Sequence, residues 1–424
     1  MTIDARSSGR MRSALARLAQ LPEDALHYAV GKARGWAVSR RLAAAGRAPR
    51  LRASAVRELE QRWGRLAQGQ QADGAGPTAA ERLLLRQIRE ATAAANRNNV
   101  TRTAAYLAVY ERCPELHWAL LAHLVSRNGG WNMTDLAGEL LPALLDAPQR
   151  AAVFAMLERA NALIFGDAYP QLLLYEAALS RGRCLAHLLP DLGVSRFMGP
   201  VWEQFWRLRD PVPLALALIV NEQHFIEGRV VRNAAFRHEV LDQPFFALQG
   251  PAQLNLVLFP YGEPDGRLRL AGLVLEDFSD LSERIGFGKR LYALLFGVPA
   301  VHAGALAFAR RMPHTGSRAD YAPRLFRAAR PPAAPAAPAD RIHRGRLRRG
   351  AALLCSPPLC AAWPDRPVAT AEPGDWFADA PSVVRHMRGV RRPHSYELTN
   401  EYGFALNKLE TAADAARRLK RPPD

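Results

Sequence analysis

The sequence predicts a mainly α-helical protein, in which a multi-helix globular core carries one small β-hairpin. Hydrophobic residues make up 49% of the 424 residues, a proportion typical of a chain that buries a core. Between residues 79 and 230 the apolar residues recur at helical spacing, and only residues 253–275 break that rhythm. These two observations define the fold class.

The N-terminal part, residues 9–68, has the pattern of two or three Ala/Arg-rich helices, and the polar, Gly-containing stretch 67–78 predicts a linker. The core region then continues as a series of helices. Their expected ranges are 79–95, 101–112, 114–127, 134–145, 148–165, 169–188, 196–208 and 212–230.

The interruption at 253–275 is typical of a β-hairpin. Leucines alternate with other residues in 253–260 and again in 267–275, and Pro264-Asp265-Gly266 between them are turn formers. Because two strands alone are marginally stable, we expect this hairpin to pack on the helices.

Helices resume at 279–296, and the stretch Leu291–Ala309 is long enough to span a membrane. It is rich in alanine and contains Gly297-Val298-Pro299, however. Alanine favours insertion weakly and proline interrupts a helix, so we expect two short core helices and no transmembrane segment.

The chain divides by composition into four parts. Residues 1–78 form a basic, Ala/Arg-rich helical extension, and 79–328 form the helical core. Residues 329–350 are a Pro/Ala-rich basic tether, expected to be semi-rigid and unpacked. Residues 351–424 regain aromatic content, so we expect this segment to dock on the core through a terminal helix at about 402–419.

The net charge of +17 is concentrated in two flanks, because 1–80 and 322–392 each carry +8 while 81–321 carry only +1. A basic flank attracts phosphate polyanions, so nucleic-acid or anionic-membrane binding is one hypothesis. A solvated basic surface is the interpretation that the Ala/Pro-rich context favours. Aromatic residues are not interleaved with the arginines at 341–349, as a base-stacking surface would require.

The cysteines indicate a reducing compartment. Cys113, Cys184, Cys355 and Cys360 form no C-x-x-C pair, and residues 1–12 are polar and basic without the apolar run of an export signal. We therefore expect a soluble cytoplasmic protein with reduced thiols. These spacings do not suit a cysteine zinc site, and we predict neither a metal nor a cofactor.

The segment His117–Asp135 is the richest in polar side chains. His117 lies on an apolar stripe, whereas His123, Ser126 and Arg127 share another helix face. Those three side chains could bind an anion or polarise a substrate, or they could satisfy the free carbonyls of a helix end, which is the favoured interpretation.

The same segment contains a helix-termination signal. We expect the helix to end near Asn128-Gly129-Gly130, and Thr134 or Asp135 to cap the next helix. Asn128 and Asn132, in the expected loop, are added to the binding candidates.

A second polar group lies in 158–175. Glu158 and Asn161 are one helical turn apart, away from the apolar stripe. Asp167 is expected in a loop before Tyr169-Pro170, because proline suits the first position of a helix. There its charge would favour the helix start without any catalytic role. Glu158, Asn161 and Asp167 are all binding candidates.

The third group follows the apolar run 214–220, which predicts a buried helix. Asn221 and Glu222 continue it, and a buried carboxylate needs an Arg, a His or a ligand as partner. Arg229, two turns on, is the candidate partner. Glu222 could act as a general acid or base with a raised pKa, but a structural ion pair is the favoured interpretation.

Two weaker candidates lie near the hairpin. Asp277 follows the second strand, and strand ends often present functional side chains. Lys289 follows Gly286-Phe287-Gly288 and superficially resembles a phosphate-binding loop, but the hydroxyl of that motif is absent and a glycine-containing turn is favoured. No nucleophile elbow, H-E-x-x-H motif or dinucleotide fingerprint is present.

Several runs are similar to a known family. They are 98–103 (NNVTRT), 117–118 (HW), 126–135 (SRNGGWNMTD), 158–161 (ERAN), 167–172 (DAYPQL), 221–223 (NEQ), 316–321 (GSRADY) and 400–402 (NEY). With these runs the chain resembles the bacterial YppC-like family, a domain of unknown function. The resemblance covers about 95–322 and parts of the tail, and it implies no activity and no catalytic residues.

Three functions remain open. The leading hypothesis is a cytoplasmic helical protein that acts through a polar groove or a partner surface, because polar clusters occur in an apolar helical frame. The second is a hydrolase-like enzyme in which Glu222, His123, Arg127 and Asp277 meet in one pocket. The third is polyanion binding by the two basic flanks.

Overall fold

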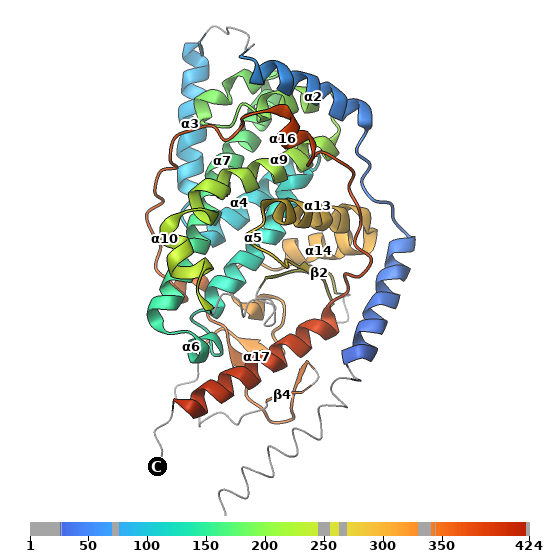
Figure 1. Ribbon diagram of the computed structural model, residues 1–424, viewed down its shortest axis with the longest axis vertical. Coiled ribbons are helices and arrows are strands. Elements are labelled where there is room, and N and C mark those ends of the chain that lie inside the picture. The colour runs from blue at the N-terminus through green and yellow to red at the C-terminus, as the bar shows by residue number, and fades with distance from the viewer. Residues whose placement is uncertain are drawn as a thin grey trace, which may run out of the picture.

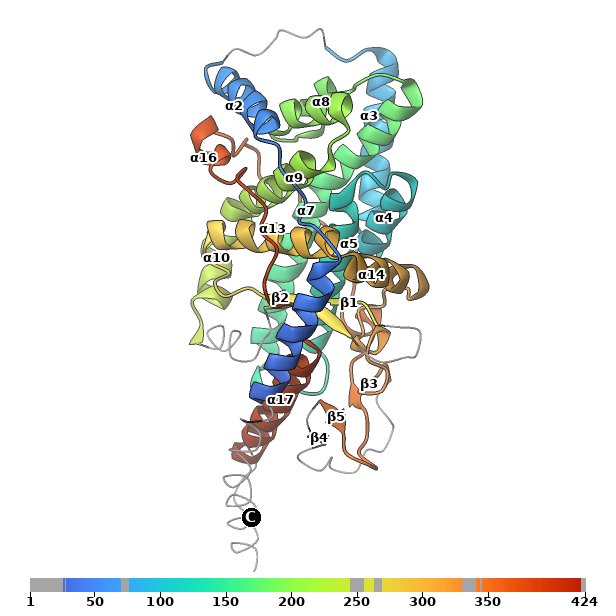
Figure 2. The same ribbon diagram turned by 90° about the vertical axis from the view of Figure 1, so that its right-hand side faces the viewer.

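The computed structural model describes Leu26 and residues 28–69, 76–244, 255–262, 269–329, 341–343 and 345–420. The described residues form an elongated body of stacked helices (Figure 1), with three small two-stranded sheets in its lower half (Figure 2). The predicted mainly α class with a small hairpin is confirmed.

The helices begin with an unlabelled one over 28–44. The labelled helices are α2 (Ala53–Ala67), α3 (Ala79–Ala95), α4 (Asn99–Arg112), α5 (His117–Asp135), α6 (Leu141–Leu144), α7 (Ala147–Arg181), α8 (Met198–Leu208), α9 (Pro211–Ile226), α10 (Ala234–Phe236), α13 (Leu281–Gly297), α14 (Pro299–Arg311), α15 (Leu359–Ala362), α16 (Ala380–Val384) and α17 (Thr399–Leu419). Single turns occur at η1 (Ala186–Leu188), η2 (Pro190–Leu192), η3 (Glu227–Val231), η4 (Arg237–Leu241) and η5 (Arg318–Asp320). The strands are β1 (Leu256–Pro260), β2 (Leu270–Val274), β3 (Phe326–Arg327), β4 (Ile342–His343), β5 (Arg346–Leu347) and β6 (Leu354–Cys355).

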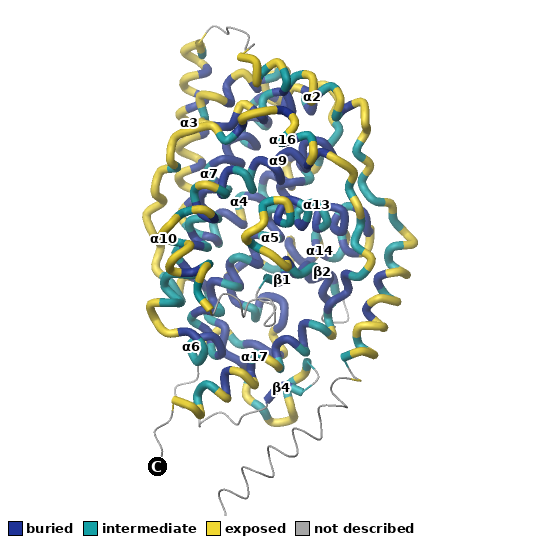
Figure 3. The backbone as a smooth tube through the Cα atoms, viewed as in Figure 1, coloured by how far each residue is buried: buried dark blue, intermediate teal, exposed yellow. Residues whose placement is uncertain are grey.

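Helix α9 lies at the centre of the core. Its run 214–220 is apolar on every side and is buried throughout, as predicted (Figure 3). It packs against α5, α7, α8 and α13, which surround it. The Asp210 side chain accepts from Val212 N and caps its first turn.

Helix α5 is longer than predicted, because it continues through Asn128-Gly129-Gly130 to Asp135. The expectation of a helix end there is wrong. A Cβ on Gly130 would lie 2.3 Å from Asn99 Oδ1 and 2.4 Å from His314 Nε2. This glycine therefore serves close packing of a neighbour against the helix and does not end it.

Helix α7 is also continuous, and the predicted loop at Asp167 does not exist. Pro170 lies inside this helix, where its missing N–H removes one backbone hydrogen bond at a typical cost of ~3 kcal/mol. Burial of Phe165, Leu172 and neighbouring side chains on α7 offsets that cost. The helix begins with a capping box between Asp146 and Gln149.

The predicted hairpin is confirmed as the antiparallel pair β1 and β2, in which Leu256 lies opposite Val274. Its expected turn, Pro264-Asp265-Gly266, lies outside the described residues. Both edges are covered. Asn128 of α5 donates to Leu258 O (2.8 Å) and accepts from Leu258 N (2.8 Å), and the 396–398 segment bonds the edge of β2.

Helices α13 and α14 are separate, as the Gly297-Val298-Pro299 break predicted. The described residues contain no single helix with the length and hydropathy of a membrane span. These two helices pass that test only as a pair, and the pair is bent by 93° at the break.

The first described helix packs against α17, the last one. Helix 28–44 lies beside it (Figure 2), with Tyr28 4.7 Å from the ring of Phe404, and α17 itself contacts α6 and β4. Residues 341–349 do not continue an unpacked tether as expected. They contain β4 and β5, and Arg341 is buried in ion pairs with Glu139 and Glu410.

Candidate functional site

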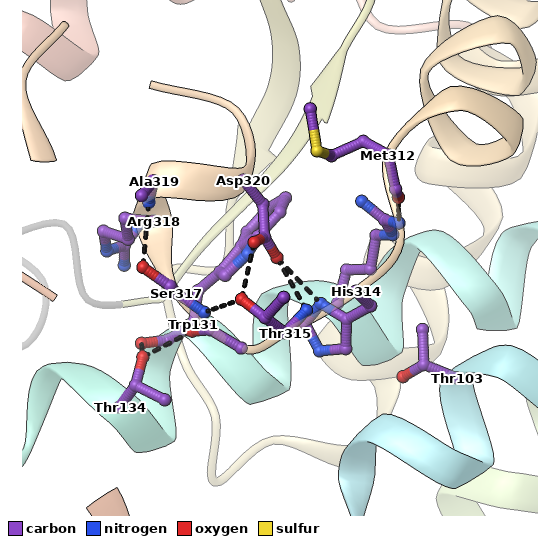
Figure 4. A network of polar contacts seen from close by, with 12 residues as sticks. Thr103, Trp131, Thr134, Met312, His314, Thr315, Ser317, Arg318, Ala319 and Asp320 are labelled. Carbon is purple, nitrogen blue, oxygen red and sulfur yellow. Dashed lines mark hydrogen bonds and ion pairs between the residues drawn. The ribbon is translucent and has the colours of Figure 1, made fainter. Parts of the chain in front are cut away.

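A buried polar network joins α4, α5 and the chain that follows α14. We call it the His314 network, and its members are Asn99, Thr103, His123, Ser126, Arg127, His314, Thr315 and Asp320. In Figure 4 the side chains of His314 and Thr315 point toward Asp320. Apart from Thr315, every side chain in this network is buried.

The hydrogen bonds determine how Asn99 and His314 are oriented. Asn99 Nδ2 donates to Ser126 O (2.9 Å) and to Ser126 Oγ (3.1 Å), so Asn99 Oδ1 must accept from His314 Nε2 at 2.9 Å. A neutral His314 therefore presents the lone pair of Nδ1 to Asp320 Oδ2, 3.5 Å away. Protonation at Nδ1 would convert this contact into an ion pair.

Burial lowers the pKa of His314, which favours the neutral ring. Burial alone would raise the pKa of Asp320, but the hydrogen bonds that Thr315 donates to it act in the opposite direction, and the pKa lies below its usual value. Thr315 contributes both its N–H (2.9 Å) and its hydroxyl (2.6 Å). Asp320 is thus a carboxylate whose charge is stabilised by fixed donors.

His123 and Arg127 are joined to each other. His123 Nδ1 donates to Thr103 O at 2.7 Å, which leaves Nε2 to accept from Arg127 Nε at 3.2 Å. Burial, followed by the charge of Arg127, lowers the pKa of His123 to about 3, so this ring is neutral. Both side chains lie in mid-helix. The favoured prediction that they satisfy a helix end is therefore wrong.

Arg127 keeps one donor without a partner. Its Nη2 donates to Met312 O and its guanidinium lies 4.7 Å from the centre of the Phe308 ring, but Nη1 has no hydrogen-bond partner. Burial lowers the pKa of Arg127 to about 10, so the group remains charged at neutral pH. A buried, charged donor left without a partner is energetically costly.

The asparagines of α5 are occupied by structural contacts. Asn128 bonds the backbone of β1, as described above. Asn132 Oδ1 accepts from Arg318 (3.2 Å), whose guanidinium also forms an ion pair with Asp135 at 2.6 Å.

A cleft of 850 Å³ opens beside the network. It is bordered by β1, α14, the 320–325 segment, β5 and the start of α17. Asp320 belongs to both the network and the cleft, and Phe308 and Met312, which contact Arg127 of the network, also line the cleft. We call it the arginine cleft, because its lining includes Arg269, Arg311, Arg324 and Arg346. Within the described ranges, Arg311, Arg324 and Arg346 form no ion pair with an acid.

A second cavity, of 680 Å³, contains Asp167 in its wall. Residues 368–377, here called the strap, cross this cavity, which we call the strap cavity. Asp167 accepts from Asn221 and Gln171, and Asn221 in turn accepts from Trp376 of the strap at 3.0 Å. The predicted candidates Asp167 and Asn221, from different helices, are therefore brought together.

Three more candidates have partners of their own, and of these three Arg229 lines the strap cavity whereas Glu158 and Asn161 do not belong to its lining. Arg229 donates to the strap carbonyls of Glu372 (2.8 Å) and Gly374 (2.9 Å), and it does not pair with Glu222. Glu158 is held by Arg102 in a buried ion pair at 2.5 Å. Asn161 Nδ2 donates to Leu157 O, in its own helix.

Glu222 has neutral partners. It accepts from Trp118 Nε1 and from Gln223 Nε2, both at 3.2 Å, so the expected structural ion pair is absent from the described part of the chain. Burial raises the pKa of Glu222 to about 8, although these two donors act in the opposite direction. Glu222 is protonated at neutral pH.

The last two candidates are structural. Asp277 is exposed and accepts from Ser279 N at 2.8 Å in a local turn. Lys289 donates to two carbonyls of the tail, His386 O and Arg388 O, each at 2.7 Å. Gly286 and Gly288 lie inside α13, so neither a phosphate loop nor a turn is present. A Cβ on Gly288 would come within 2.8 Å of Ile219, which explains the glycine by close helix packing.

The enzyme hypothesis required four residues in one pocket, and the contacts do not support that arrangement. Only His123 and Arg127 are bonded to each other. Glu222 belongs to the contacts around Trp118, and Asp277 is on the surface. Among the described residues, no group of three or more His, Cys, Asp or Glu could hold a metal ion.

The arginines that line the arginine cleft were not singled out by sequence reasoning. Asp320 and Tyr321 lie in the run 316–321 that carries the family resemblance, and that run was the available signal for this part of the site. Arg324 and Arg346 could not be distinguished from the other arginines of the basic stretch 322–392.

Comparison with known proteins gives a family without an assigned role. Residues 94–400 match the model of a family described as a protein of unknown function (DUF2515). The uncharacterized protein YppC of Bacillus subtilis (strain 168) is 44% identical over 239 residues, which are 56% of this chain and 73% of that protein. No solved structure matches the chain. Arg127, Asp167, His314 and Asp320 all lie within the matched range.

Proposed function

Since the chain belongs to the DUF2515 family, proteins of unknown function, we propose its role from the site alone: it binds a small phosphate-bearing organic ligand in the arginine cleft. One observation carries this proposal. The charged groups of Arg311, Arg324 and Arg346 border a single cleft, and no acidic side chain among the described residues pairs with them.

Arginine suits a phosphate because its planar guanidinium offers parallel N–H donors that match two phosphate oxygens. Several arginines elsewhere in the described part of the chain have acidic partners, for example Arg112 with Glu176 and Arg207 with Glu58, whereas Arg311, Arg324 and Arg346 have none. The cleft arginines therefore keep their donors available. Arg127 adds one unpaired buried donor behind Phe308 and Met312, two residues of the cleft lining.

The dimensions favour a small molecule. A volume of 850 Å³ falls within the usual range of ligand pockets, ~300–1,000 Å³. The lining also contains Phe308, Tyr321 and Leu325, which can receive an apolar or aromatic moiety. A phosphate ester with an organic part, such as a nucleotide, meets both requirements.

This proposal assigns anion binding to one site, the arginine cleft, whereas the earlier hypothesis assigned it to the two basic flanks as a whole. Arg324 and Arg346 belong to the basic stretch 322–392, so part of that charge borders the cleft. Arg341, from the same stretch, is neutralised by Glu139 and Glu410. We place the protein in the cytoplasm, for which its four free cysteines provide support.

The test is calorimetric titration with ATP, pyrophosphate and adenosine. We expect ATP and pyrophosphate to bind and adenosine, which lacks phosphate, to bind far more weakly. In the double variant R324A/R346A, ATP affinity should fall by more than about tenfold, because one charge-assisted hydrogen bond contributes ~1.5–3 kcal/mol. The control R86A removes an exposed arginine of α3 outside the cleft and should change nothing.

Equal binding of adenosine and ATP would contradict the proposal. So would equal losses in R86A and R324A/R346A, which would indicate unspecific attraction to a basic surface. A single-stranded oligonucleotide could bind more tightly than ATP and keep the same affinity for the double variant R324A/R346A. That result would favour polyanion binding by other parts of the flanks.

A further inference from the structure

The strap cavity contains a buried acid that lacks a hydrogen-bond donor. Asp167 is 5% exposed and lines a cavity of 680 Å³. Its Oδ2 accepts from Asn221 Nδ2 and from Gln171 Nε2 (3.1 Å), whereas Oδ1 has no hydrogen-bond partner among the described residues. Such an unsatisfied buried oxygen is costly, and a bound donor would remove the cost.

The cations around the cavity are already engaged by the strap. Arg159 donates to Ala369 O (2.5 Å) and Thr370 O (3.1 Å). Arg229 holds the carbonyls of Glu372 and Gly374. None of these arginine contacts reaches Asp167.

Arg196 completes this arrangement. It forms an ion pair with Asp375 at 3.0 Å and donates to Phe377 O at 3.0 Å. Within the described part of the chain, the direct partners of Asp167 are therefore two neutral amides, and no cationic side chain contacts its carboxylate.

We propose that the strap cavity binds a small organic cation, a primary amine whose ammonium group donates to Asp167 Oδ1. An ammonium group supplies a hydrogen-bond donor for Asp167 Oδ1 and a positive charge opposite the carboxylate. A neutral alcohol of the same length supplies only the donor. The strap side chain of Trp376, bonded to Asn221 at 3.0 Å, positions the amide that holds the other oxygen of Asp167.

Binding of an amine to this acid depends on pH. Burial raises the pKa of Asp167 to about 7, and the hydrogen bond from Asn221 lowers it. Among the other charged groups around it, Arg229 of η3 lowers that pKa and Asp375 of the strap raises it. Glu222 of α9 is also an electrostatic neighbour, and its own pKa is raised by Asp167. An ammonium binds the ionised form, so affinity should increase as the pH rises through about 7.

The experiment compares putrescine with 1,4-butanediol, a neutral diol of the same length, by calorimetric titration of the whole chain. We expect putrescine to bind about tenfold more tightly at about pH 8 than at about pH 6, because the ionised fraction of an acid with a pKa near 7 changes by that factor. The diol should show no such change. In D167N, which keeps the shape of the side chain, binding of putrescine should fall by at least about tenfold.

The matched control is E372Q. Glu372 is an exposed carboxylate of the strap at the same cavity, and its replacement should leave putrescine affinity within about twofold of the original. Equal losses in E372Q and D167N would overturn the proposal, because they would indicate general attraction of a cation to acids. Equal affinity for the diol and the diamine would overturn it as well.

A measurement on the unaltered chain covers the case in which D167N fails to fold. In a carbon-13 titration of labelled aspartates, putrescine should lower the pKa of the one aspartate signal that titrates near pH 7. If that pKa does not move at saturating putrescine, the amine does not contact Asp167 and the proposal is wrong.

Discussion

At the scale of single residues, two acids that sequence reasoning chose as candidates, Glu222 and Asp167, have neutral hydrogen-bond partners. Glu222 is bonded by an indole and an amide, and Asp167 by two amides. Helical periodicity placed Glu222 toward the core because position on a helix is a local property. It could not identify Trp118 as the partner, which lies 104 residues earlier in the chain.

Replacement of Glu222 by glutamine should flatten the dependence of stability on pH. The pKa of Glu222 is raised to about 8 in the folded chain, so the folded state holds its proton more tightly than the unfolded state. The contribution to stability is complete below the unfolded pKa, near 4.5, and is lost as the pH rises to about 8. Its slope is at most about 1.4 kcal/mol per pH unit.

Urea unfolding of the original chain and E222Q between about pH 5 and pH 8 measures this effect. The matched control is E90Q, at an exposed position of α3, which should retain the original slope. Asp167 contributes with the same sign, so some slope should persist in E222Q. If E222Q and the original chain lose stability in parallel, Glu222 does not hold a proton in the folded state.

At the scale of elements, local signals predicted the two hairpin strands, missed the four short strands β3 to β6 and were misleading for two helices. Turn chemistry and alternation predicted β1 and β2, and Gly297-Val298-Pro299 predicted the break between α13 and α14. In α5 and α7, however, glycines and a proline lie inside continuous helices. Tertiary packing outweighs such breakers when the neighbours bury the helix on most of its surface.

The stability of the hairpin should depend on Asn128, because its side-chain amide bonds the backbone of β1 at the edge where a third strand would otherwise pair. In N128A both the N–H and the C=O of Leu258 lose their partner within the core, which should lower the free energy of unfolding by about 2–4 kcal/mol. Chemical denaturation measures the loss, and Q87A, at an exposed position of α3, is the control. A loss in N128A as small as that in Q87A would mean that water or another group replaces the amide.

At the scale of the whole molecule, the first described helix and the C-terminal segment hold each other. Ser39 is fully buried, and its Oγ accepts from the backbone N–H groups of Tyr396 (3.1 Å) and Glu397 (3.0 Å). The same segment, 396–398, bonds the open edge of β2. One side chain near the N-terminus therefore supports the segment that covers the central hairpin.

Loss of this hydroxyl should loosen the tail selectively. S39A leaves two buried N–H groups unpaired and should cost about 2 kcal/mol or more. Amide exchange should become faster at residues 396–398 and along the edge of β2. The control S180A removes an exposed hydroxyl of α7 that bonds only its own helix. Unchanged exchange at 396–398 in S39A would show that other contacts hold the two ends together.

The sequence by itself determined the helical class, the hairpin, the buried α9 and the α13–α14 break, because periodicity and turn chemistry act within a few residues. Only the tertiary structure decided which polar groups meet. It brings His314 to Asn99, 215 residues away, and arginines of distant segments to one cleft. A hydrogen bond or a shared cavity depends on positions in space that no local pattern encodes, and the candidate sites of this protein are made of such contacts.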